Sequence, residues 1–451
     1  MAALLLAVLS GAAGCDPDEP PPLEALGQSD GGLTGPENTN GPALFGVVST
    51  DRSVTSISIL RADGSVLARD FIHSGSATTG LVTALSGDVV LPTRSGEPGV
   101  LTLIDRFRTD VITRIDLDDG EVLGQVKTQQ PQQAGDTAYS SNPQDWVQLD
   151  AERAFVSRFG PNPRVAPDDL DRGSDLLELD PSTLERSGRR IDFGRLDTEG
   201  ERENADTGER ESVPVYARPS RIVRLPAPEQ DWLVVGLARL SEGYDAVGPG
   251  AVALVNLETQ ELSPVDLEGL ENCGFVATVP DGSARVVVAC SGFFRGELRD
   301  GAGVALLSIT AGEAEIESLW RANSDPDGPV IGASVLPLGG SVVLGVELGS
   351  GEVLDDGGAV LEPARNDKLY RLDLSGGAPE LIFEAQGRYV LGEGALSYTE
   401  GLIFWPDGSS DDNGKPTAGL RIFELGEDFE LSEREVLELD PQLAPRQVAA
   451  L

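Results

Sequence analysis

The sequence predicts an all-β protein, a seven-bladed β-propeller with four-stranded antiparallel blades. Three observations lead to this prediction. One hairpin pattern recurs seven times, a second and more apolar hairpin lies between most copies, and the C-terminal segment reads as a strand without a blade of its own. Outside the first fourteen residues, no stretch of about a dozen residues has helical periodicity, which disfavours α/β folds.

The recurrent hairpin consists of an alternating apolar run, a polar turn with Gly, Asp, Ser or Thr, and a second apolar run. Successive copies lie roughly 50 to 80 residues apart, a spacing that suits one propeller blade plus variable loops. The copies begin at Ser56, Ile112, Leu176, Ala253, Ala305, Tyr370 and Leu420.

The second hairpin supplies the other two strands of each unit. An isolated four-stranded sheet leaves apolar faces in water, whereas radial stacking buries both faces and leaves only short edges. A ring is therefore favoured over a string of separate hairpins. These second hairpins begin at Pro143, Ser220, Cys273, Ile331 and Leu391.

The two chain ends predict how the ring closes. Only one strand, LFGVVST from Leu44, precedes the first recurrent hairpin, so that blade lacks its innermost strand. The segment PRQVAAL, from Pro445 to Leu451, matches the first strand of the other blades. We expect this C-terminal strand to complete the first blade, and its deletion to unfold the domain.

The N-terminus predicts export. Residues 1–14 are an apolar run of signal-peptide length, too short to cross a bilayer as a helix. Residues 15–42 are acidic and rich in Pro and Gly, as a disordered linker would be, and residues 43–451 form the propeller.

The small residues directly before Cys15 resemble the bacterial lipobox. The resemblance implies a lipoprotein signal peptide, a lipid such as palmitate on Cys15, and anchoring to the bacterial cell envelope, at the outer rather than the inner membrane. The alternative is an ordinary signal peptide followed by an incidental cysteine.

Cys273 and Cys290 form an even pair in a chain that is expected to be exported, so we predict a disulfide. The pair brackets a hairpin whose two-residue turn would be Asp281-Gly282, with Pro280 opposite Ser283. That register places Cys273 opposite Cys290 in a non-hydrogen-bonded pair, within disulfide reach. A redox switch is the less favoured alternative, because nothing cationic lies nearby to lower a thiol pKa.

The third blade carries the most specific pattern. RAFVSRFG followed by GSDLLELDPSTLERSGRRIDF resembles the YVTN repeat of YncE-like secreted β-propellers, and VITRIDLDDGEVLGQV in the second blade is similar. The resemblance implies a seven-bladed ring that often binds something across one face. It implies no reaction.

Charge and residue types exclude several functions. Lys and Arg total 34 against 75 Asp and Glu, a net charge of -41, which disfavours nucleic acid and predicts a soluble monomer whose only membrane contact is the lipid anchor.

The single histidine, His73, lies in a loop position and is expected to be solvated, which disfavours serine–histidine hydrolysis and a zinc site of several histidines. We expect no cofactor other than a calcium ion. The tryptophans occupy different strands of their blades and are expected to pack individually: Trp146, Trp232, Trp320 and Trp405.

Two acidic turns are candidate calcium loops, because they place oxygen ligands at alternate positions. Solvated turns are the alternative interpretation. The candidate ligands are Asp407, Asp411 and Asn413 in one turn, and Asp325 and Asp327 in the other.

The mouth of the central channel is the main candidate site, because side chains from all blades converge there. Its three arginines could hold a carboxylate or phosphate group, or could pair with neighbouring acids between blades. The charged inserts 194–214 and 349–367 are expected to be surface loops that could bind protein. The residues expected at the mouth are Ser76, Thr79, Asn142, Gln144, Arg218, Arg221, Asn272, Glu393 and Arg446.

Two functions follow from these observations. The leading hypothesis is a non-catalytic, envelope-anchored binding or scaffold propeller that recognises a protein, peptide or glycan. The rival is a calcium-dependent, lactonase-type hydrolase.

Overall fold

The computed structural model describes most of the chain from residue 44 onward and shows an all-β protein. Its two short 3₁₀ helices are η1 (Asp169–Asp171) and η2 (Gly194–Leu196), and no helix in the described ranges is long and apolar enough to cross a membrane. The predicted segments 1–14 and 15–42, with Cys15, lie outside the described residues. The description covers residues 44–451 apart from 95, 107, 131–138, 165–167, 204–208, 296–297, 323–327, 352, 355–359, 363 and 411–416.

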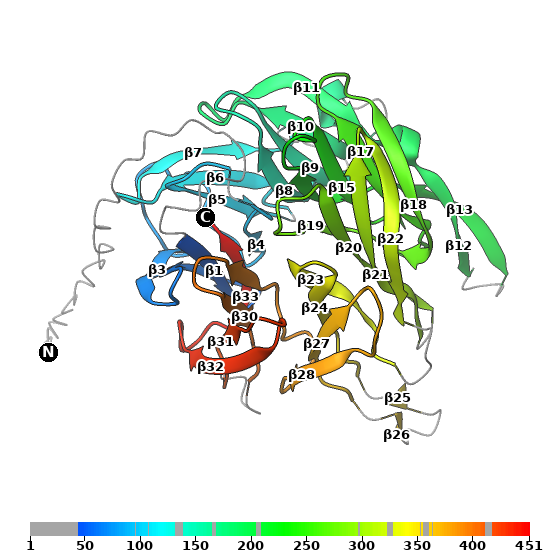
Figure 1. Ribbon diagram of the computed structural model, residues 1–451. Helices are drawn as coiled ribbons and strands as arrows, with labels where there is room; N and C mark the ends of the chain where they lie inside the picture. Colours follow the sequence, from blue (N-terminus) through cyan, green and yellow to red (C-terminus); the bar gives the residue numbers. More distant parts are fainter. Residues whose placement is uncertain are drawn as a thin grey trace, which may run out of the picture.

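The sheets are arranged radially around a centre, with the C-terminus beside β1 (Figure 1). Seven sheets in the described ranges have four antiparallel strands, each sheet built from strands close in sequence except the first. The prediction of an all-β propeller with four-stranded antiparallel blades is confirmed.

The strands of each blade are given from the axis outward. Blade 1 contains β33 (Pro445–Ala450), β1 (Leu44–Thr50), β2 (Thr55–Arg61) and β3 (Val66–His73). Blade 2 contains β4 (Val89–Val90), β5 (Val100–Asp105), β6 (Val111–Asp116) and β7 (Val122–Lys127). Blade 3 contains β8 (Pro143–Gln148), β9 (Ala154–Pro161), β10 (Gly173–Leu179) and β11 (Arg186–Asp192).

The remaining four blades follow the same order. Blade 4 contains β14 (Pro219–Arg224), β15 (Trp232–Leu237), β17 (Pro249–Asn256) and β18 (Leu262–Glu271). Blade 5 contains β19 (Phe275–Thr278), β20 (Arg285–Arg295), β21 (Leu298–Thr310) and β22 (Glu313–Arg321). Blade 6 contains β23 (Ile331–Gly339), β24 (Val342–Glu347), β27 (Lys368–Asp373) and β28 (Glu380–Glu384). Blade 7 contains β29 (Ala395–Ser397), β30 (Leu402–Pro406), β31 (Leu420–Leu425) and β32 (Leu431–Leu437).

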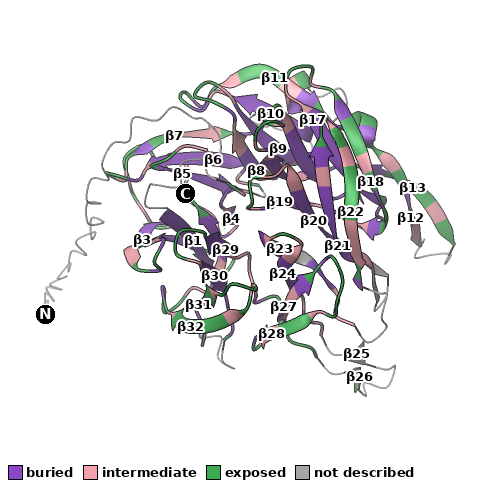
Figure 2. Cartoon of the chain, in the orientation of Figure 1, coloured by how far each residue is buried: buried purple, intermediate pink, exposed green. Residues whose placement is uncertain are grey.

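Burial falls from the middle of each blade to its outer edge. The strand β1 (LFGVVST) is buried along its whole length, whereas β32 (LSEREVL) is largely exposed (Figure 2). A middle strand has a neighbouring blade on each face, so both of its faces are apolar. An outermost strand meets solvent along one edge, which explains why the sequence becomes polar there.

The first blade joins the two ends of the chain. Strand β33 pairs with β1 in antiparallel register, with Phe45 opposite Ala450 and Val47 opposite Val448. The backbone N–H of Leu451 donates to the carbonyl of Leu44 at 2.8 Å. The C-terminal strand therefore occupies the innermost position of blade 1, as predicted from the sequence.

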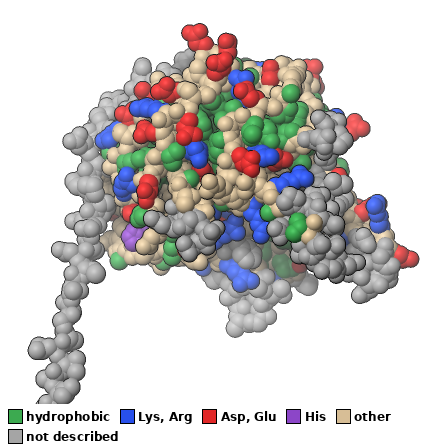
Figure 3. Space-filling view, turned by 90° about the horizontal axis from the view of Figure 1, so that it is seen from below, with side chains coloured by type: hydrophobic (Ala, Val, Ile, Leu, Met, Phe, Trp, Pro, Cys, Tyr) green, Lys and Arg blue, Asp and Glu red, His purple; other side chains and the backbone are tan. Residues whose placement is uncertain are grey.

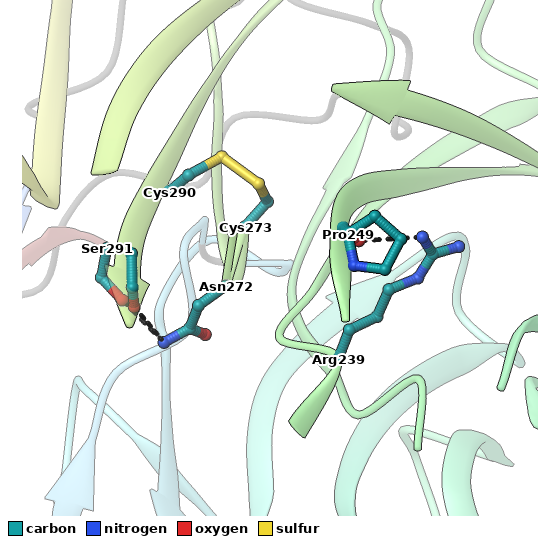
Figure 4. Close-up of a disulfide and its surroundings, with 7 residues drawn as sticks. Arg239, Pro249, Asn272, Cys273, Cys290 and Ser291 are labelled. Atoms are coloured by element: carbon teal, nitrogen blue, oxygen red, sulfur yellow. Dashed lines mark hydrogen bonds between the residues drawn. A yellow bond between two sulfur atoms is a disulfide. The ribbon is translucent and has the colours of Figure 1, made fainter. Parts of the chain in front are cut away.

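Cys273 and Cys290 form the predicted disulfide (Figure 4). The predicted register holds at the cysteines, where the Ser291 N–H donates to the Asn272 carbonyl at 3.0 Å, but it is wrong by one residue nearer the turn, where Phe275 pairs with Ala289 and the Val279 N–H bonds to the Arg285 carbonyl at 2.9 Å. The predicted two-residue turn required a backbone N–H at Pro280, which proline lacks. The chain therefore makes a longer loop between β19 and β20.

The two charged inserts were expected to be loops, and this expectation was wrong. The first insert holds η2, β12 (Thr198–Glu203) and β13 (Arg210–Tyr216), which form a three-stranded sheet with β16 (Leu240–Ser241). The second holds β25 (Val353–Leu354) and β26 (Val360–Glu362), which pair with each other. In the first insert, β16 gives the charged hairpin a partner strand, which the sequence pattern did not reveal.

Antiparallel pairing divides the loops between two faces of the ring. On the turn face lie the connections between the first and second, and between the third and fourth, strands of each blade. On the mouth face lie the other loops, including those through which the chain reaches each innermost strand. Seen from one side, Asp and Glu side chains spread along the upper rim of the ring, and Lys and Arg side chains gather in the lower middle of the view (Figure 3).

Candidate binding site at the channel mouth

A cavity of about 440 Å³ lies on the mouth face, between blades 1, 2, 6 and 7. Its walls carry three arginines and two acids together with aliphatic side chains. The charged residues are Arg52, Asp88, Arg106, Glu393 and Arg446, and the aliphatic ones include Val48, Val90, Val346 and Leu348.

An ion pair crosses the channel beside this cavity. Arg221, near the start of β14, bonds to Glu393, which precedes β29 on the other side of the ring. The same guanidinium donates to the carbonyls of Leu91 at 3.2 Å and Gln144 at 3.4 Å. The Arg221 side chain is 7% exposed and that of Glu393 is 33% exposed. One arginine of blade 4 thus bonds to blades 2, 3 and 7.

The ionisation of Glu393 depends on this pair. Burial pushes the pKa of Glu393 up, but the charge and hydrogen bond of Arg221 outweigh burial and hold the pKa below its ordinary value. Gln447 of β33 adds a hydrogen bond to Glu393 at 2.9 Å. Glu393 is therefore an ionised partner of Arg221 at neutral pH, and a poor proton acceptor.

Asp145 of β8 fixes the neighbouring strands around the same axis. Its carboxylate accepts from the Thr93 N–H at 2.8 Å, the Thr93 hydroxyl at 2.6 Å and the Ile222 N–H at 2.8 Å. Burial raises the pKa of Asp145 even though Arg221 and these donors act against the rise. Asp145 therefore joins blades 2, 3 and 4 at the channel wall.

Arg106 follows β5 and is held by acceptors from two blades. Its Nε donates to Asp88 at 3.0 Å, and its Nη1 donates to Gln144 Oε1 at 3.3 Å. Gln144 is oriented in turn by its amide group, which donates to Asn142 Oδ1 at 2.8 Å. Arg106 is thus a paired cation of the cavity wall.

Arg446 and Arg52 differ from the other arginines of the site. Nη1 of Arg446 donates to the Tyr389 carbonyl at 2.6 Å, while its buried Nε has no hydrogen-bond partner. Burial and the positive charge of Arg52 lower the pKa of Arg446. Within the part of the chain that the structure describes, neither Arg446 nor Arg52 forms an ion pair. The cavity therefore holds two neighbouring cations without a bonded acid.

The structure brings together five of the predicted mouth residues. Gln144, Arg221 and Glu393 meet at the axis, Asn142 orients Gln144, and Arg446 lines the cavity. For Arg221, the alternative that a mouth arginine pairs with a neighbouring acid is the one observed.

Arg218 and Asn272 lie elsewhere and hold local structure. Arg218 is buried, donates to the carbonyls of Leu240 at 2.9 Å and Ser241 at 2.7 Å, and lies 4.5 Å from the centre of the Tyr244 ring. The Asn272 amide donates to the Ser291 hydroxyl at 2.7 Å beside the disulfide (Figure 4).

Two further predicted residues, Ser76 and Thr79, also lie outside the cavity lining. The Ser76 hydroxyl accepts from the His73 N–H at 3.0 Å, and Thr79 is exposed. Both therefore belong to the loop that follows blade 1, with no contact to the cavity.

Sequence reasoning missed Arg52, Arg106 and Gln447. The prediction considered only the loops that lead into innermost strands, whereas Arg52 and Arg106 lie between second and third strands, on the same face. A basic residue one or two positions after the second strand of a blade is the signal that could have found them. Gln447 lies within the predicted closing strand and shows no distinguishing pattern.

The calcium hypothesis concerns residues that are only partly described. Asp407 is buried, and its carboxylate accepts from the Ser409 N–H at 3.0 Å and from Arg421 Nε at 2.8 Å. The described residues contain no group of three or more His, Cys, Asp or Glu that could hold a metal. The other candidate ligands, Asp325, Asp327, Asp411 and Asn413, lie outside the described residues.

Comparison with known proteins does not assign this chain to a family. No family model matches the chain, and no curated protein matches it. The chain is similar to a periplasmic gluconolactonase, PpgL, of Pseudomonas aeruginosa (13% identity, 91% of this chain and 99% of that one, TM-score 0.49). It is also similar to AztD from Citrobacter koseri (12% identity, 91% and 98%, TM-score 0.39) and to the Cps50 propeller of Myceliophteria thermophila (11% identity, 84% and 96%, TM-score 0.42).

At these identities and TM-scores, the likenesses say nothing about the site of this chain. The propeller is established by its own sheet topology. The likeness to YncE-like propellers rests on the repeat residues alone.

Proposed function

We propose that this protein is a non-catalytic binding propeller that holds an anionic group of its ligand in the cavity at the channel mouth. One observation carries the proposal: Arg52 and Arg446 share the cavity without an acid partner in the described part of the chain. Two neighbouring guanidinium groups repel each other, so an anion between them would be stabilised by charge-assisted hydrogen bonds.

The chemistry of the cavity supports binding over hydrolysis. Its acids serve ion pairs, Glu393 with Arg221 and Asp88 with Arg106, and neither is arranged as a free general base. His73 is the last residue of β3, on the outer edge of blade 1, where its Nδ1 accepts from the Gly75 N–H at 3.1 Å. For the lactonase-type alternative, the buried carboxylate of Asp407 is already bonded to Ser409 and Arg421.

Export and anchoring are part of the same proposal. The disulfide between Cys273 and Cys290 supports an oxidising compartment, and the apolar run 1–14 supplies the export signal. Lipidation of Cys15 would hold the propeller at the envelope of a bacterium. The net charge of -41 on the protein repels phosphate backbones, so the proposed ligand is not a nucleic acid.

The anchor is tested by Cys15→Ser in a bacterial host. The lipid-anchor proposal expects wild-type protein in the membrane fraction and the variant in the soluble exported fraction. If both proteins are exported and soluble, the ordinary signal peptide is the correct interpretation.

The anion site is tested by titration calorimetry with citrate, inorganic phosphate and glucuronate on the full chain. We expect at least one of these anions to bind, and Arg446→Gln or Arg52→Gln to weaken its binding by about tenfold or more, since each removes a charge-assisted hydrogen bond. The matched control is Arg434→Gln, because Arg434 lies on the outer strand β32 beside Glu435 at 3.7 Å. Equal binding by Arg446→Gln and wild type, or no binding of any anion, would contradict the proposal.

A further inference from the structure

The cavity is lined by side chains of two chemical kinds, and this combination narrows the class of ligand. Arg52 and Arg446 suit a carboxylate. Val346, Leu348 and Leu391, the aliphatic part of the lining, have side chains that offer no hydrogen bond. A ligand that contacts both kinds of side chain must present a carboxylate and an aliphatic group close together.

The aliphatic part disfavours a sugar acid. A hydroxyl group placed against Val346 or Leu348 would lose its hydrogen bonds to water without replacement, which costs free energy. A volume of about 440 Å³ is within the usual size of pockets for small ligands and short chain ends. The cavity therefore suits a compact apolar group better than a ring of hydroxyls.

The two acids of the cavity disfavour a second negative charge. Asp88 and Glu393 line the same space as the arginines, and each carboxylate is an acceptor only. A phosphate or a second carboxylate near them would be repelled, whereas a peptide N–H would find an acceptor. This combination favours a single carboxylate followed by main-chain amide groups.

The rim supports a ligand that continues out of the cavity. Tyr389 lines the cavity and is 42% exposed, so its ring is available to a chain that leaves the mouth. Tyrosine is one of the residues that are enriched where proteins bind each other. A ligand confined to the cavity would not require such a rim.

We propose that the cavity binds the C-terminal end of a peptide whose last side chain is aliphatic. This inference rests on the proposed function and specifies its ligand. The terminal carboxylate bonds to Arg446 and Arg52, the last side chain packs against Val346, Leu348 and Leu391, and the preceding residues leave over Tyr389. Capture of a C-terminal carboxylate is a known mode of peptide recognition.

The test uses fluorescein-labelled Ala-Ala-Ser-Val-Leu in two forms, one with a free carboxylate and one with a C-terminal amide. Fluorescence anisotropy with the full chain is expected to show binding of the acid form and binding of the amide weaker by about tenfold or more, because the amide carries no charge. A third peptide that ends in Glu in place of Leu is expected to bind more weakly than the Leu peptide, since it places a charged carboxylate against Val346, Leu348 and Leu391.

Protein variants locate the contact. Arg446→Gln and Arg52→Gln are expected to remove most of the difference between the acid and amide peptides, while Arg434→Gln retains it. Because acid and amide peptides are compared on the same protein, a change in the stability of a variant does not imitate this result.

The possible outcomes test the peptide inference and the anion site separately. Equal binding of acid and amide, or a preference for the Glu peptide, would overturn the peptide inference. If the peptides fail but citrate, phosphate or glucuronate binds in an Arg446-dependent way, the peptide inference falls and the anion site stands. If no probe binds, both proposals fall.

Discussion

The turn face and the mouth face of the ring use their charged residues differently. On the turn face, Asp63, Asp281 and Asp373 each accept the backbone N–H two residues later, at 2.8, 3.0 and 2.9 Å. These carboxylates close their own turns, as Asp does in many turns. On the mouth face, Arg52 and Arg446 close no turn through their side chains and line a cavity. The comparison separates carboxylates that close the turns of the fold from two arginines that line a cavity and have no bonded acid among the described residues.

The basic residues follow the same division. In the segments that form the turns of the turn face, Arg94 and Arg153 are the basic residues among many Asp and Glu. The mouth face gathers Arg106, Arg221 and Arg446 around one channel. A protein with a net charge of -41 therefore concentrates positive charge at the place where side chains of several blades converge.

The largest effect is expected from deletion of residues 445–451, which removes β33 and with it part of the mouth. Blade 1 would lose the strand that pairs with β1, and Leu44, Val47 and Val48 would lose their cover. We expect loss of cooperative thermal unfolding by calorimetry. A truncated protein that still unfolds cooperatively near the wild-type temperature would show that the ring does not depend on this closure.

The next effect compares the ion pair at the channel with an ion pair on the outer surface. Arg221→Met leaves Glu393 beside the axis without its partner, and we expect a loss of about 3 kcal/mol in the free energy of unfolding, measured in urea. The double variant Arg221→Met with Glu393→Gln is expected to recover part of the loss.

The control for this pair is Arg434→Met, since Arg434 and Glu435 form an exposed pair. Its loss is expected to stay below about 0.5 kcal/mol. Equal losses at the two pairs would mean that the channel pair is no more structural than a surface pair.

A smaller effect tests the turn face. Asp373→Ala removes the acceptor of the Ser375 N–H and of the Ser341 hydroxyl, so a loss of about 1 kcal/mol is expected. Asp373→Asn keeps an acceptor oxygen in the turn and is expected to lose less than about half of that. If the Asn variant is as unstable as the Ala variant, the charge and not the turn geometry is what the position requires.

The smallest effect is a pH dependence at the mouth. The folded pKa of Glu393 is below its unfolded value, so its contribution to stability is complete above the unfolded pKa and is lost as pH falls through the folded pKa. The difference in free energy of unfolding between wild type and Glu393→Gln is therefore expected to shrink from pH 6 toward pH 3.5. A difference that grows on acidification would contradict the assigned pair.

The propeller architecture could be predicted from the sequence because each blade repeats a similar hairpin pattern. Each of the seven recurrent hairpins, from that at Ser56 to that at Leu420, forms the outer two strands of a blade. The inner hairpin of blade 2 was not predicted, because β4 has only two residues, Val89 and Val90, and so shows no strand pattern in the sequence. The cysteine pair and its local register were predicted correctly, whereas the register nearer the turn was not, because Pro280 cannot donate the hydrogen bond of a two-residue turn.

The site was predictable only in part, because position along the chain does not fix direction in space. Arg218 and Arg221 both lie where the chain reaches β14, yet Arg221 crosses the channel while Arg218 turns to Leu240 and Tyr244. Arg218 has a positive φ of 49°, and its side chain bonds to carbonyls in the connection between β15 and β17 of its own blade. Such a backbone conformation in a non-glycine residue has no clear signature in a single sequence.

The central claim is that the mouth face is the working surface and the turn face supports it. Hydrogen exchange of the full chain with and without a saturating concentration of the peptide Ala-Ala-Ser-Val-Leu tests this claim most directly. We predict added protection in the segments around Tyr389 and Gln447, and none in turns 180–185 and 257–261. Protection confined to those turns, or no protection anywhere at saturation, would contradict the account.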